Sequence, residues 1–199
     1  EAYKWVLGSM IKSWQKAWGK EFPFIIVQLP RFLARHPELA VEDSGWPKIR
    51  ESMEWIADNV PGAMMSVNID LGDEKDIHPK DKFQVGDRLA AVALQRVYKS
   101  RPDGEAPRVV KSALQGDAWV LTYDRAVVLK GEGKGYAVQG ADGKWAYVTA
   151  KADGAKVTVS AADVKAPKAV RYAWANFPEV SVYSAGSDAL PAGPWRSDK

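Results

Sequence analysis

A nearly continuous apolar run at residues 24–29 lies between two prolines, Pro23 and Pro30. The run is short and rich in β-branched residues, and it does not alternate between apolar and polar positions. This pattern is typical of a strand buried on both faces, and such strands belong mainly to parallel sheets. Residues 64–69 form a second run of this kind. The sequence therefore predicts at least two strands of a parallel sheet.

Three helices are predicted around these strands. Apolar residues recur three or four positions apart over residues 3–18 and 79–98, and another helix is expected to open at Ser44 and Pro47 and to end before Pro61. Strands that alternate with helices at this spacing predict an α/β fold for residues 1–100. A sheet usually has about five strands. We therefore expect this region to be one part of an open parallel sheet whose other half lies elsewhere.

The pattern changes after Ser100. Residues 101–107 are rich in proline, glycine and charged residues, which predicts a domain boundary there. Beyond this segment, short β-type runs are separated by Gly-Asp and Asp-Gly pairs, which favour hairpin turns. We predict two domains, an α/β domain at residues 1–100 and a small antiparallel β-sandwich at residues 101–199. The strands are expected at residues 109–114, 118–123, 136–138, 145–150, 156–160, 169–174 and 180–183.

Composition argues against several classes of protein. The chain has 28 Lys and Arg against 25 Asp and Glu, mixed along its length, so no basic stripe for nucleic acid is expected. No stretch approaches the ~18 uninterrupted apolar residues of a membrane span. Without cysteine there is no disulfide and no thiolate metal site. Residues 1–5 have neither an initiator methionine nor signal-peptide features, so we do not expect them to begin the gene product.

Only two histidines are present, so an imidazole base would have to be His36 or His78. His36 lies in a polar segment, where an exposed loop histidine is the ordinary interpretation. His78 follows a predicted buried strand and precedes Pro79, in the first turn of a predicted helix whose positive end would disfavour ring protonation. Ligands of open α/β sheets bind outside the carboxyl ends of the strands, which makes His78 a candidate general base. A histidine that caps the helix start is the alternative.

Carboxylates surround this histidine. Asp76, two residues earlier, is placed to hold the second ring nitrogen and to fix the tautomer. The acidic stretch at residues 70–76 also invites a calcium interpretation. Counted from Asp70 as the first loop position, however, Gly72, Lys75 and Asp81 occupy the positions where a hand-type loop needs an oxygen ligand, a glycine and a glutamate. We interpret the stretch as a solvated acidic loop and predict no metal site.

Candidate substrate contacts are fewer. Trp5, Trp14 and Trp18 have helical spacing and are predicted to lie in the core. Trp46 is expected in a loop near the sheet edge that carries His78, and Gln28 stands at the end of its strand. Trp46 and Gln28 are therefore the candidates for contact with a substrate.

Five segments together resemble the sialate O-acetylesterase family of SGNH hydrolases. One joins the first predicted helix to the first strand, and another, read as DIHPKDK, looks like the family's last catalytic block. The match covers nearly the whole chain and lies at residues 11–29, 76–82, 85–90, 167–174 and 190–198.

The resemblance implies a serine esterase that removes acetyl groups from O-acetylated sugars without a metal or an organic cofactor. His78 falls on the family's catalytic histidine. Many SGNH hydrolases place an aspartate three residues earlier, where this chain has Lys75, while Asp76 is offset by one. A triad with Asp76 and a dyad supported by backbone carbonyls therefore both stay open. The family's secretion implies an extracytoplasmic location.

The nucleophilic serine and the glycine and asparagine of the oxyanion hole come, in that family, from blocks that precede the first helix here. We therefore expect this chain to be a C-terminal portion of an SGNH-type α/β domain followed by the β-sandwich. Its expected partners are the N-terminal part of the same enzyme and an O-acetylated sugar, with the isolated chain inactive. A xylan-type acetylesterase and a non-catalytic carbohydrate-binding or scaffold fragment are the alternatives.

Overall fold

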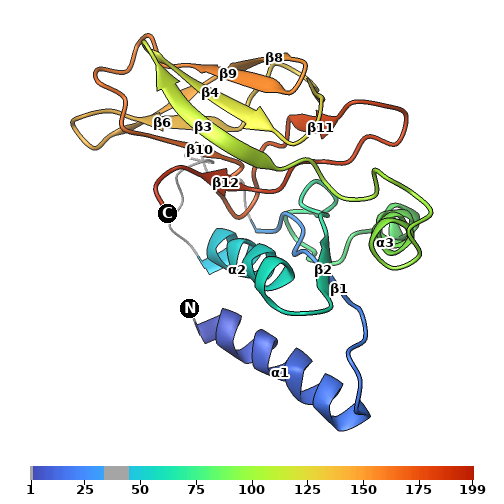
Figure 1. The fold of residues 1–199 in the computed structure, drawn as a ribbon. Helices are drawn as coiled ribbons and strands as arrows, with labels where there is room; N and C mark the ends of the chain where they lie inside the picture. The colour runs from blue at the N-terminus through green and yellow to red at the C-terminus, as the bar shows by residue number, and fades with distance from the viewer. Residues whose placement is uncertain (1, 34–44) are drawn as a thin grey trace.

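The computed structural model of the protein describes residues 2–33 and 45–199 (Figure 1). Its first part contains the three predicted helices and a parallel pair of strands. These elements are α1 (Ala2–Trp18), β1 (Phe24–Val27), α2 (Gly45–Asn59), β2 (Ala63–Ser66) and α3 (Lys82–Arg96). His36 and Ser44, which the sequence placed in a loop and at a helix start, lie outside the described residues.

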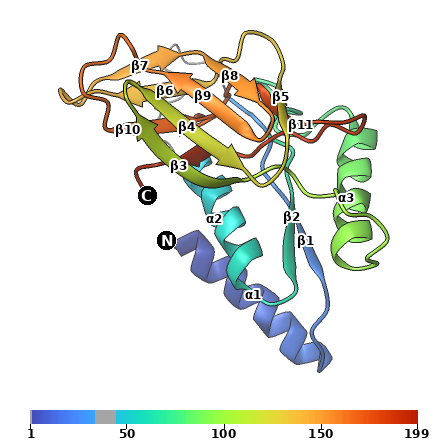
Figure 2. The same cartoon turned by 45° about the horizontal axis from the view of Figure 1, so that its top comes forward.

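The parallel pairing of β1 and β2 is confirmed, with Phe24 opposite Ala63 and Val27 opposite Ser66. Helices α1 and α2 cover one face of the pair and α3 lies on the other side (Figure 2). The core on the first face is built from Ile11, Ile56, Val60 and Ala63. Within the described residues the parallel sheet has these two strands, and their membership of a larger open sheet whose other half lies elsewhere stays a prediction.

The start of α3 differs from the prediction. The helix begins at Lys82 rather than at Pro79, because the Asp81 carboxylate accepts the backbone N–H of Gln84 at 3.0 Å and acts as the N-cap. His78 therefore lies in the loop, four residues before the helix. The effect of the helix dipole falls off within the first turn, so it contributes less at His78 than the sequence suggested.

Antiparallel strands form the second part of the chain, as predicted. Two four-stranded sheets have the strand orders β3-β4-β9-β8 and β12-β10-β6-β7, and β5 pairs with β11. The strands are β3 (Val109–Gln115), β4 (Ala118–Tyr123), β5 (Val127–Leu129), β6 (Tyr136–Gln139), β7 (Trp145–Val148), β8 (Ala150–Asp153), β9 (Lys156–Ser160), β10 (Ala169–Tyr172), β11 (Val182–Ser184) and β12 (Trp195–Arg196).

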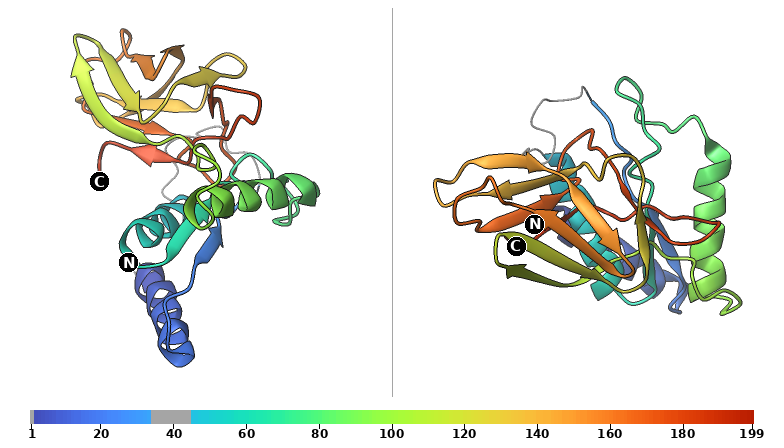
Figure 3. Two further views of the ribbon diagram at one scale, coloured as in Figure 1. Left: turned by 45° about the vertical axis from the view of Figure 1, so that its right-hand side comes forward. Right: turned by 90° about the horizontal axis from the view of Figure 1, so that it is seen from above.

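One hydrophobic core joins these sheets to the end of β2. Leu121 and Val157 come from one four-stranded sheet and Val138 from the other, and all three are fully buried. Val67 and Ile69, which continue the chain from β2, belong to the same cluster. Figure 3 shows the antiparallel strands stacked over the end of the parallel pair. The division into domains at residue 100 stays a prediction, since this core includes residues from both sides of it.

The tryptophans of α1 are not in the core, and that prediction is wrong. Trp5, Trp14 and Trp18 are 75%, 52% and 74% exposed. Only one face of α1 packs on α2 and β1, where Ile11 is fully buried. Helical spacing indicates which residues share a face, but it does not supply the element that covers that face. No helix among the described residues meets the length and hydropathy required to cross a bilayer.

Candidate active site

The loop that carries His78 starts at the carboxyl end of β2 and ends at α3. Parallel strands β1 and β2 end at the same edge of their sheet, so the segments that follow them lie side by side. The N–H of Arg31, after β1, donates to the carbonyl of Ile69, after β2, at 3.0 Å. A Cβ at Gly72 would lie 1.6 Å from the Arg31 carbonyl oxygen, so only glycine allows this close approach. The base of the His78 loop is thereby fixed against the end of β1.

His78 and Asp76 are brought together by the loop. Asp76 Oδ1 lies 2.9 Å from Nδ1 of the His78 ring and also accepts the backbone N–H of His78 at 2.9 Å. The His78 side chain is 80% exposed and that of Asp76 50%. No hydrogen bond among the described residues involves Nε2 of His78, and none joins the ring to a serine.

The contact with Asp76 determines which ring nitrogen of a neutral His78 carries the hydrogen. The hydrogen bonds from the backbone N–H and ring of His78 lower the pKa of Asp76, so its carboxylate is ionised at neutral pH. An ionised carboxylate is only an acceptor, and a neutral ring that donates to it carries its hydrogen on Nδ1. The lone pair is then on Nε2 of a side chain that is largely exposed. This is the arrangement that a general base requires.

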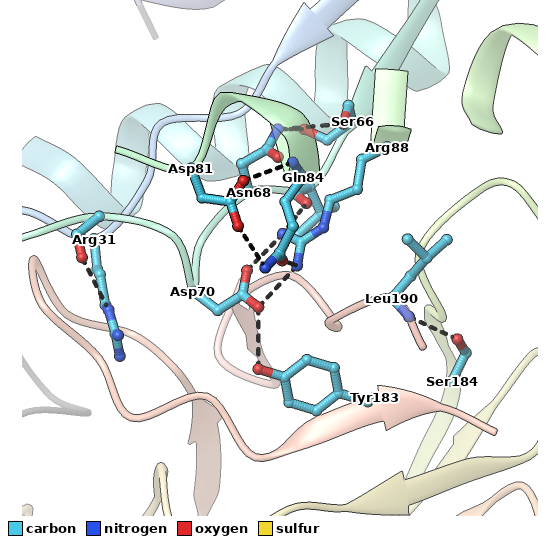
Figure 4. A network of polar contacts seen from close by, with 12 residues as sticks. Arg31, Ser66, Asn68, Asp70, Asp81, Gln84, Arg88, Tyr183, Ser184 and Leu190 are labelled. Carbon is cyan, nitrogen blue, oxygen red and sulfur yellow. Dashed lines mark hydrogen bonds and ion pairs between the residues drawn. The ribbon is translucent and has the colours of Figure 1, made fainter. Parts of the chain in front are cut away.

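Behind the loop, Asp70 forms a buried ion pair with Arg88 of α3 (Figure 4). Arg88 Nη1 donates to Asp70 Oδ1 at 2.6 Å, and Nη2 donates to Oδ2 at 2.9 Å. The Arg88 side chain is 8% exposed and the Asp70 side chain 12%. The interpretation of residues 70–76 as a solvated acidic loop is therefore wrong for Asp70. Its carboxylate is drawn inward because Arg88 offers a two-pronged donor that a carboxylate matches.

Tyr183 of β11 connects the same carboxylate to the antiparallel sheets. Its hydroxyl donates to Asp70 Oδ2 at 3.1 Å, as Figure 4 shows. Burial and the neighbouring Asp70 charge raise the pKa of Tyr183, so the hydroxyl keeps its proton and acts as the donor. Gln84 extends the network from Arg88 to the N-cap residue Asp81. We call Asp70, Arg88 and Tyr183 the Asp70 clamp; it holds both ends of the His78 loop.

Replacing Tyr183 by Phe tests the clamp. The substitution removes the hydroxyl that donates to the buried Asp70 carboxylate, and we expect it to lower the free energy of unfolding by about 1.5 kcal/mol. Urea unfolding followed by tryptophan fluorescence measures the change. Tyr98→Phe is the matched control, since Tyr98 is 72% exposed and should tolerate the change. Equal midpoints for the wild type and Tyr183→Phe would mean that the bond contributes nothing to stability.

Gln28 lies one residue beyond β1, as the sequence suggested, but its side chain is 1% exposed. Nε2 lies 3.7 Å from Sδ of Met65, and a Cβ on Gly193 would be 3.5 Å from Nε2. Oε1 is buried and has no hydrogen-bond partner among the residues that the structure describes. The Gln28 side chain is therefore packed against Met65 and the segment around Gly193, and its role in substrate contact stays a prediction.

Trp46 lies in the first turn of α2, not in a loop as predicted, because the helix already begins at Gly45. Its ring is 5.6 Å from that of Phe32, and its Nε1 donates to the carbonyl of Pro30 at 3.0 Å. The ring therefore lies beside the segment that follows β1, at the expected edge of the sheet. Neither Trp46 nor Gln28 shares a described hydrogen bond with His78 or Asp76.

Arg50 lies near the end of β1, and the sequence analysis did not identify it as a residue of this site. It is 0% exposed and donates to the carbonyls of Leu29 and Pro30 after β1, at 2.9 and 2.7 Å. It also donates to the carbonyls of Ala175 and Asn176, at 2.6 and 2.9 Å. One arginine thus joins the end of β1 to the segment after β10. One feature of the sequence did indicate that Arg50 is buried. It stands three residues before the core residue Met53, on the buried face of α2.

The fold and the site define a mixed α/β protein with a histidine–carboxylate pair in the loop between a parallel strand and the following helix. The crystal structure of a novel carbohydrate acetylesterase from Xanthomonas citri is similar to it, with a TM-score of 0.88 and 33% sequence identity. The match covers 100% of this chain and 46% of that one, so this chain spans less than half the length of its neighbour. No protein-family model matches the sequence, and neither does any curated protein.

Proposed function

We propose that this chain supplies the catalytic histidine of a serine carbohydrate acetylesterase. The observation that carries the proposal is the 2.9 Å contact between Nδ1 of His78 and Asp76, which leaves Nε2 of an 80% exposed side chain outside that contact, in the loop that follows β2. The similarity to a carbohydrate acetylesterase over the whole chain supports the reaction class. An exposed catalytic histidine is consistent with a site that polypeptide outside this chain completes.

The reaction then follows the order of serine acyl transfer. A serine outside this chain attacks the acetyl carbonyl while Nε2 of His78 takes its proton. The proton passes to the sugar oxygen as the ester bond breaks, which leaves an acetyl-serine. Water, deprotonated by the same nitrogen, attacks the acetyl group, and the proton returns to the serine as acetate leaves. Asp76 keeps the ring oriented and stabilises the imidazolium formed in each step.

The oxyanion donors belong, in this proposal, to the polypeptide outside this chain. Each such donor contributes about 3 to 4 kcal/mol to transition-state stabilisation. The substrate class we propose is an O-acetylated sugar, with sialic acid as the first candidate from the sequence resemblance and acetylated xylan as the alternative. The proposed chemistry uses only acid–base and nucleophilic groups of protein.

The test uses an acetylesterase chimera, in which this chain replaces the matching part of the Xanthomonas citri enzyme. We expect the chimera to hydrolyse 4-nitrophenyl acetate and the isolated chain to have no activity, because the isolated chain offers a base without a nucleophile. A chimera that unfolds cooperatively yet has no activity would contradict the proposal. Turnover by the isolated chain that is lost in His78→Ala would show that the nucleophile lies within it.

Trp46 is the proposed aromatic contact for the sugar. If its ring stacks on the substrate, Trp46→Ala in the chimera should raise KM for an acetylated sialic acid or xylo-oligosaccharide by about tenfold, equivalent to roughly 1.4 kcal/mol. The KM for 4-nitrophenyl acetate should change less, since that ester has no sugar ring. Equal changes for both substrates would assign Trp46 to the packing with Phe32 alone.

A further inference from the structure

A hollow of about 450 Å³ opens at the end of β7, in the antiparallel part of the chain. Among the described residues β7 is an edge strand of its sheet, and it lies on the side of the molecule away from α3 (Figure 2). The hollow has the volume of a small-molecule site, and none of its described lining residues belongs to the His78 loop. We call it the β7 hollow. The residues that line it include Lys134, Tyr147, Thr149, Ser160, Asp163 and Glu179.

Two glycines hold the backbone on either side of Lys134. Gly133 has a φ of 66°, and a Cβ there would lie 2.4 Å from the carbonyl oxygen of Ala150. Gly135 has a φ of 96°, and a Cβ there would lie 2.4 Å from the carbonyl oxygen of Glu179. Only glycine allows these two close approaches. This wall of the β7 hollow is therefore fixed before any ligand binds, which lowers the entropy lost on binding.

A tight turn after β9 forms the opposite wall. The N–H of Val164 donates to the carbonyl of Ala161 at 2.8 Å, and both residues are buried. The two residues between them, Ala162 and Asp163, are exposed and line the β7 hollow. Because both ends of the turn are packed in the core, the position of Asp163 is fixed as well.

The polar groups of the lining match the edge of a pyranose ring. Each sugar hydroxyl both donates and accepts hydrogen bonds. The lining supplies two carboxylates that accept, an ammonium group that donates and two hydroxyls that do both. The faces of a pyranose ring carry C–H groups, which pack on an aromatic ring. Tyr147 is 48% exposed and is the accessible aromatic residue of the lining, whereas Tyr136 is fully buried.

The charges of the lining disfavour an anionic sugar. The carboxylates of Asp163 and Glu179 and the ammonium group of Lys134 leave a formal charge of −1. Lys134 is also paired with Glu132 at 2.6 Å, which reduces its attraction for an anion further. A carboxylated sugar would bring another negative charge next to these carboxylates, whereas a neutral sugar meets no such repulsion.

We infer that the β7 hollow binds a neutral pyranose unit of a glycan. That the ligand is a sugar rests in part on the proposed function, in which the chain meets an O-acetylated glycan, while the preference for a neutral unit follows from the lining. In xylan this unit belongs to the backbone, and in a sialylated glycan it is one of the neutral sugars that carry the sialic acid. A unit held here raises the effective concentration of the other units of the same glycan.

Titration of the isolated chain with xylohexaose, cellohexaose and lactose, by calorimetry and amide NMR, tests the inference. We expect at least one of these neutral sugars to bind with a Kd of about 1 mM or tighter and to shift the amides of Thr149 and Ser160 most. Tyr147→Ala and Asp163→Ala should each weaken that binding at least about tenfold. Hexagalacturonate, which is anionic, should bind at least about tenfold more weakly than the neutral sugar.

Tyr98→Ala and Asp153→Ala are the matched controls. Tyr98 is 72% exposed and Asp153 is exposed in β8, and neither lines the β7 hollow, so both variants should bind the sugar like the wild type. The Tm of every variant is measured alongside, and if one of the two variants in the hollow is unfolded, the other decides.

A folded wild-type chain that binds none of the three neutral sugars at about 10 mM would overturn the inference. Wild-type affinity in a folded Tyr147→Ala or Asp163→Ala would also overturn it, because the sugar would then bind elsewhere, and so would tighter binding of hexagalacturonate. The experiment does not depend on catalysis. Sugar binding in the β7 hollow with an inactive chimera would contradict only the proposed function, and an active chimera without this binding only the inference.

Discussion

Replacing His78 by Ala in the acetylesterase chimera should lower kcat by at least ~10³-fold, the scale of losing a triad member. The variant lacks the imidazole whose Nε2 takes the serine proton in the proposed mechanism. Folding should be little affected, since the His78 side chain is 80% exposed. Steady-state hydrolysis of 4-nitrophenyl acetate, with the Tm measured alongside, gives both quantities. A loss of less than tenfold would remove His78 from the mechanism.

Two further variants in the same loop are compared with His78→Ala. Asp76→Asn should cost less than His78→Ala, because an orienting carboxylate is partly replaceable by backbone carbonyls or by Asp73. Lys75→Ala is the control, since Lys75 occupies the position of the family's aspartate but its side chain has no role in the proposed mechanism. It should retain kcat within about twofold. A loss for Lys75→Ala as large as that for His78→Ala would show that disruption of the loop, rather than loss of the base, explains both.

Arg50→Met should lower the free energy of unfolding by at least about 4 kcal/mol, because four buried carbonyls lose a donor at about 1 kcal/mol or more each. Since total stabilities are only about 5–15 kcal/mol, the variant should be close to unfolded at 37 °C. Methionine keeps most of the side-chain volume, so the effect reports the lost hydrogen bonds. Urea unfolding measures it, and a variant too unstable to purify agrees with the expectation.

Arg50→Lys and Arg101→Met are its controls. Lysine keeps the charge and has three donors, so it should recover part of the stability. Arg101 pairs with Asp103 and Asp188, whose side chains are 66% and 68% exposed, and its loss should cost less than about 1 kcal/mol. If Arg50→Met and Arg101→Met unfold at the same urea concentration, the buried hydrogen bonds of Arg50 contribute no more to the free energy of unfolding than the exposed ion pairs of Arg101.

Much of the secondary structure was predictable because its signals are local. The run at residues 24–29 marked β1, and the Asp-Gly pair at residues 153–154 marked the hairpin of β8 and β9, where Gly154 has a φ of 56°. The predicted strand at residues 145–150 is divided in the structure into β7 and β8, so β8 was not predicted as a strand of its own. The strands β5 and β12 were missed altogether. They have three and two residues and pair with β11 and β10, which are distant in sequence, so their short runs carry no periodicity of their own.

In the candidate site too, a contact between residues close in sequence was predictable and contacts between distant residues were not. The contact between Asp76 and His78 spans two residues, and its spacing alone suggested it. The Asp70–Tyr183 hydrogen bond spans 113 residues and the Arg50–Ala175 bond 125, so no local pattern indicates either. The helical spacing on α1 correctly grouped Trp14 with Trp18, but it was wrong about their burial, which depends on what covers that face.

Labelling of the acetylesterase chimera with a serine-directed fluorophosphonate, followed by digestion and mass spectrometry, tests the division of the site most directly. In the proposed mechanism the base is in this chain and the nucleophile is outside it. We therefore expect the phosphonyl group on a serine outside residues 1–199, and labelling at least about 100-fold slower in His78→Ala. A label on a serine within residues 1–199, or an equal rate in His78→Ala, would contradict the account.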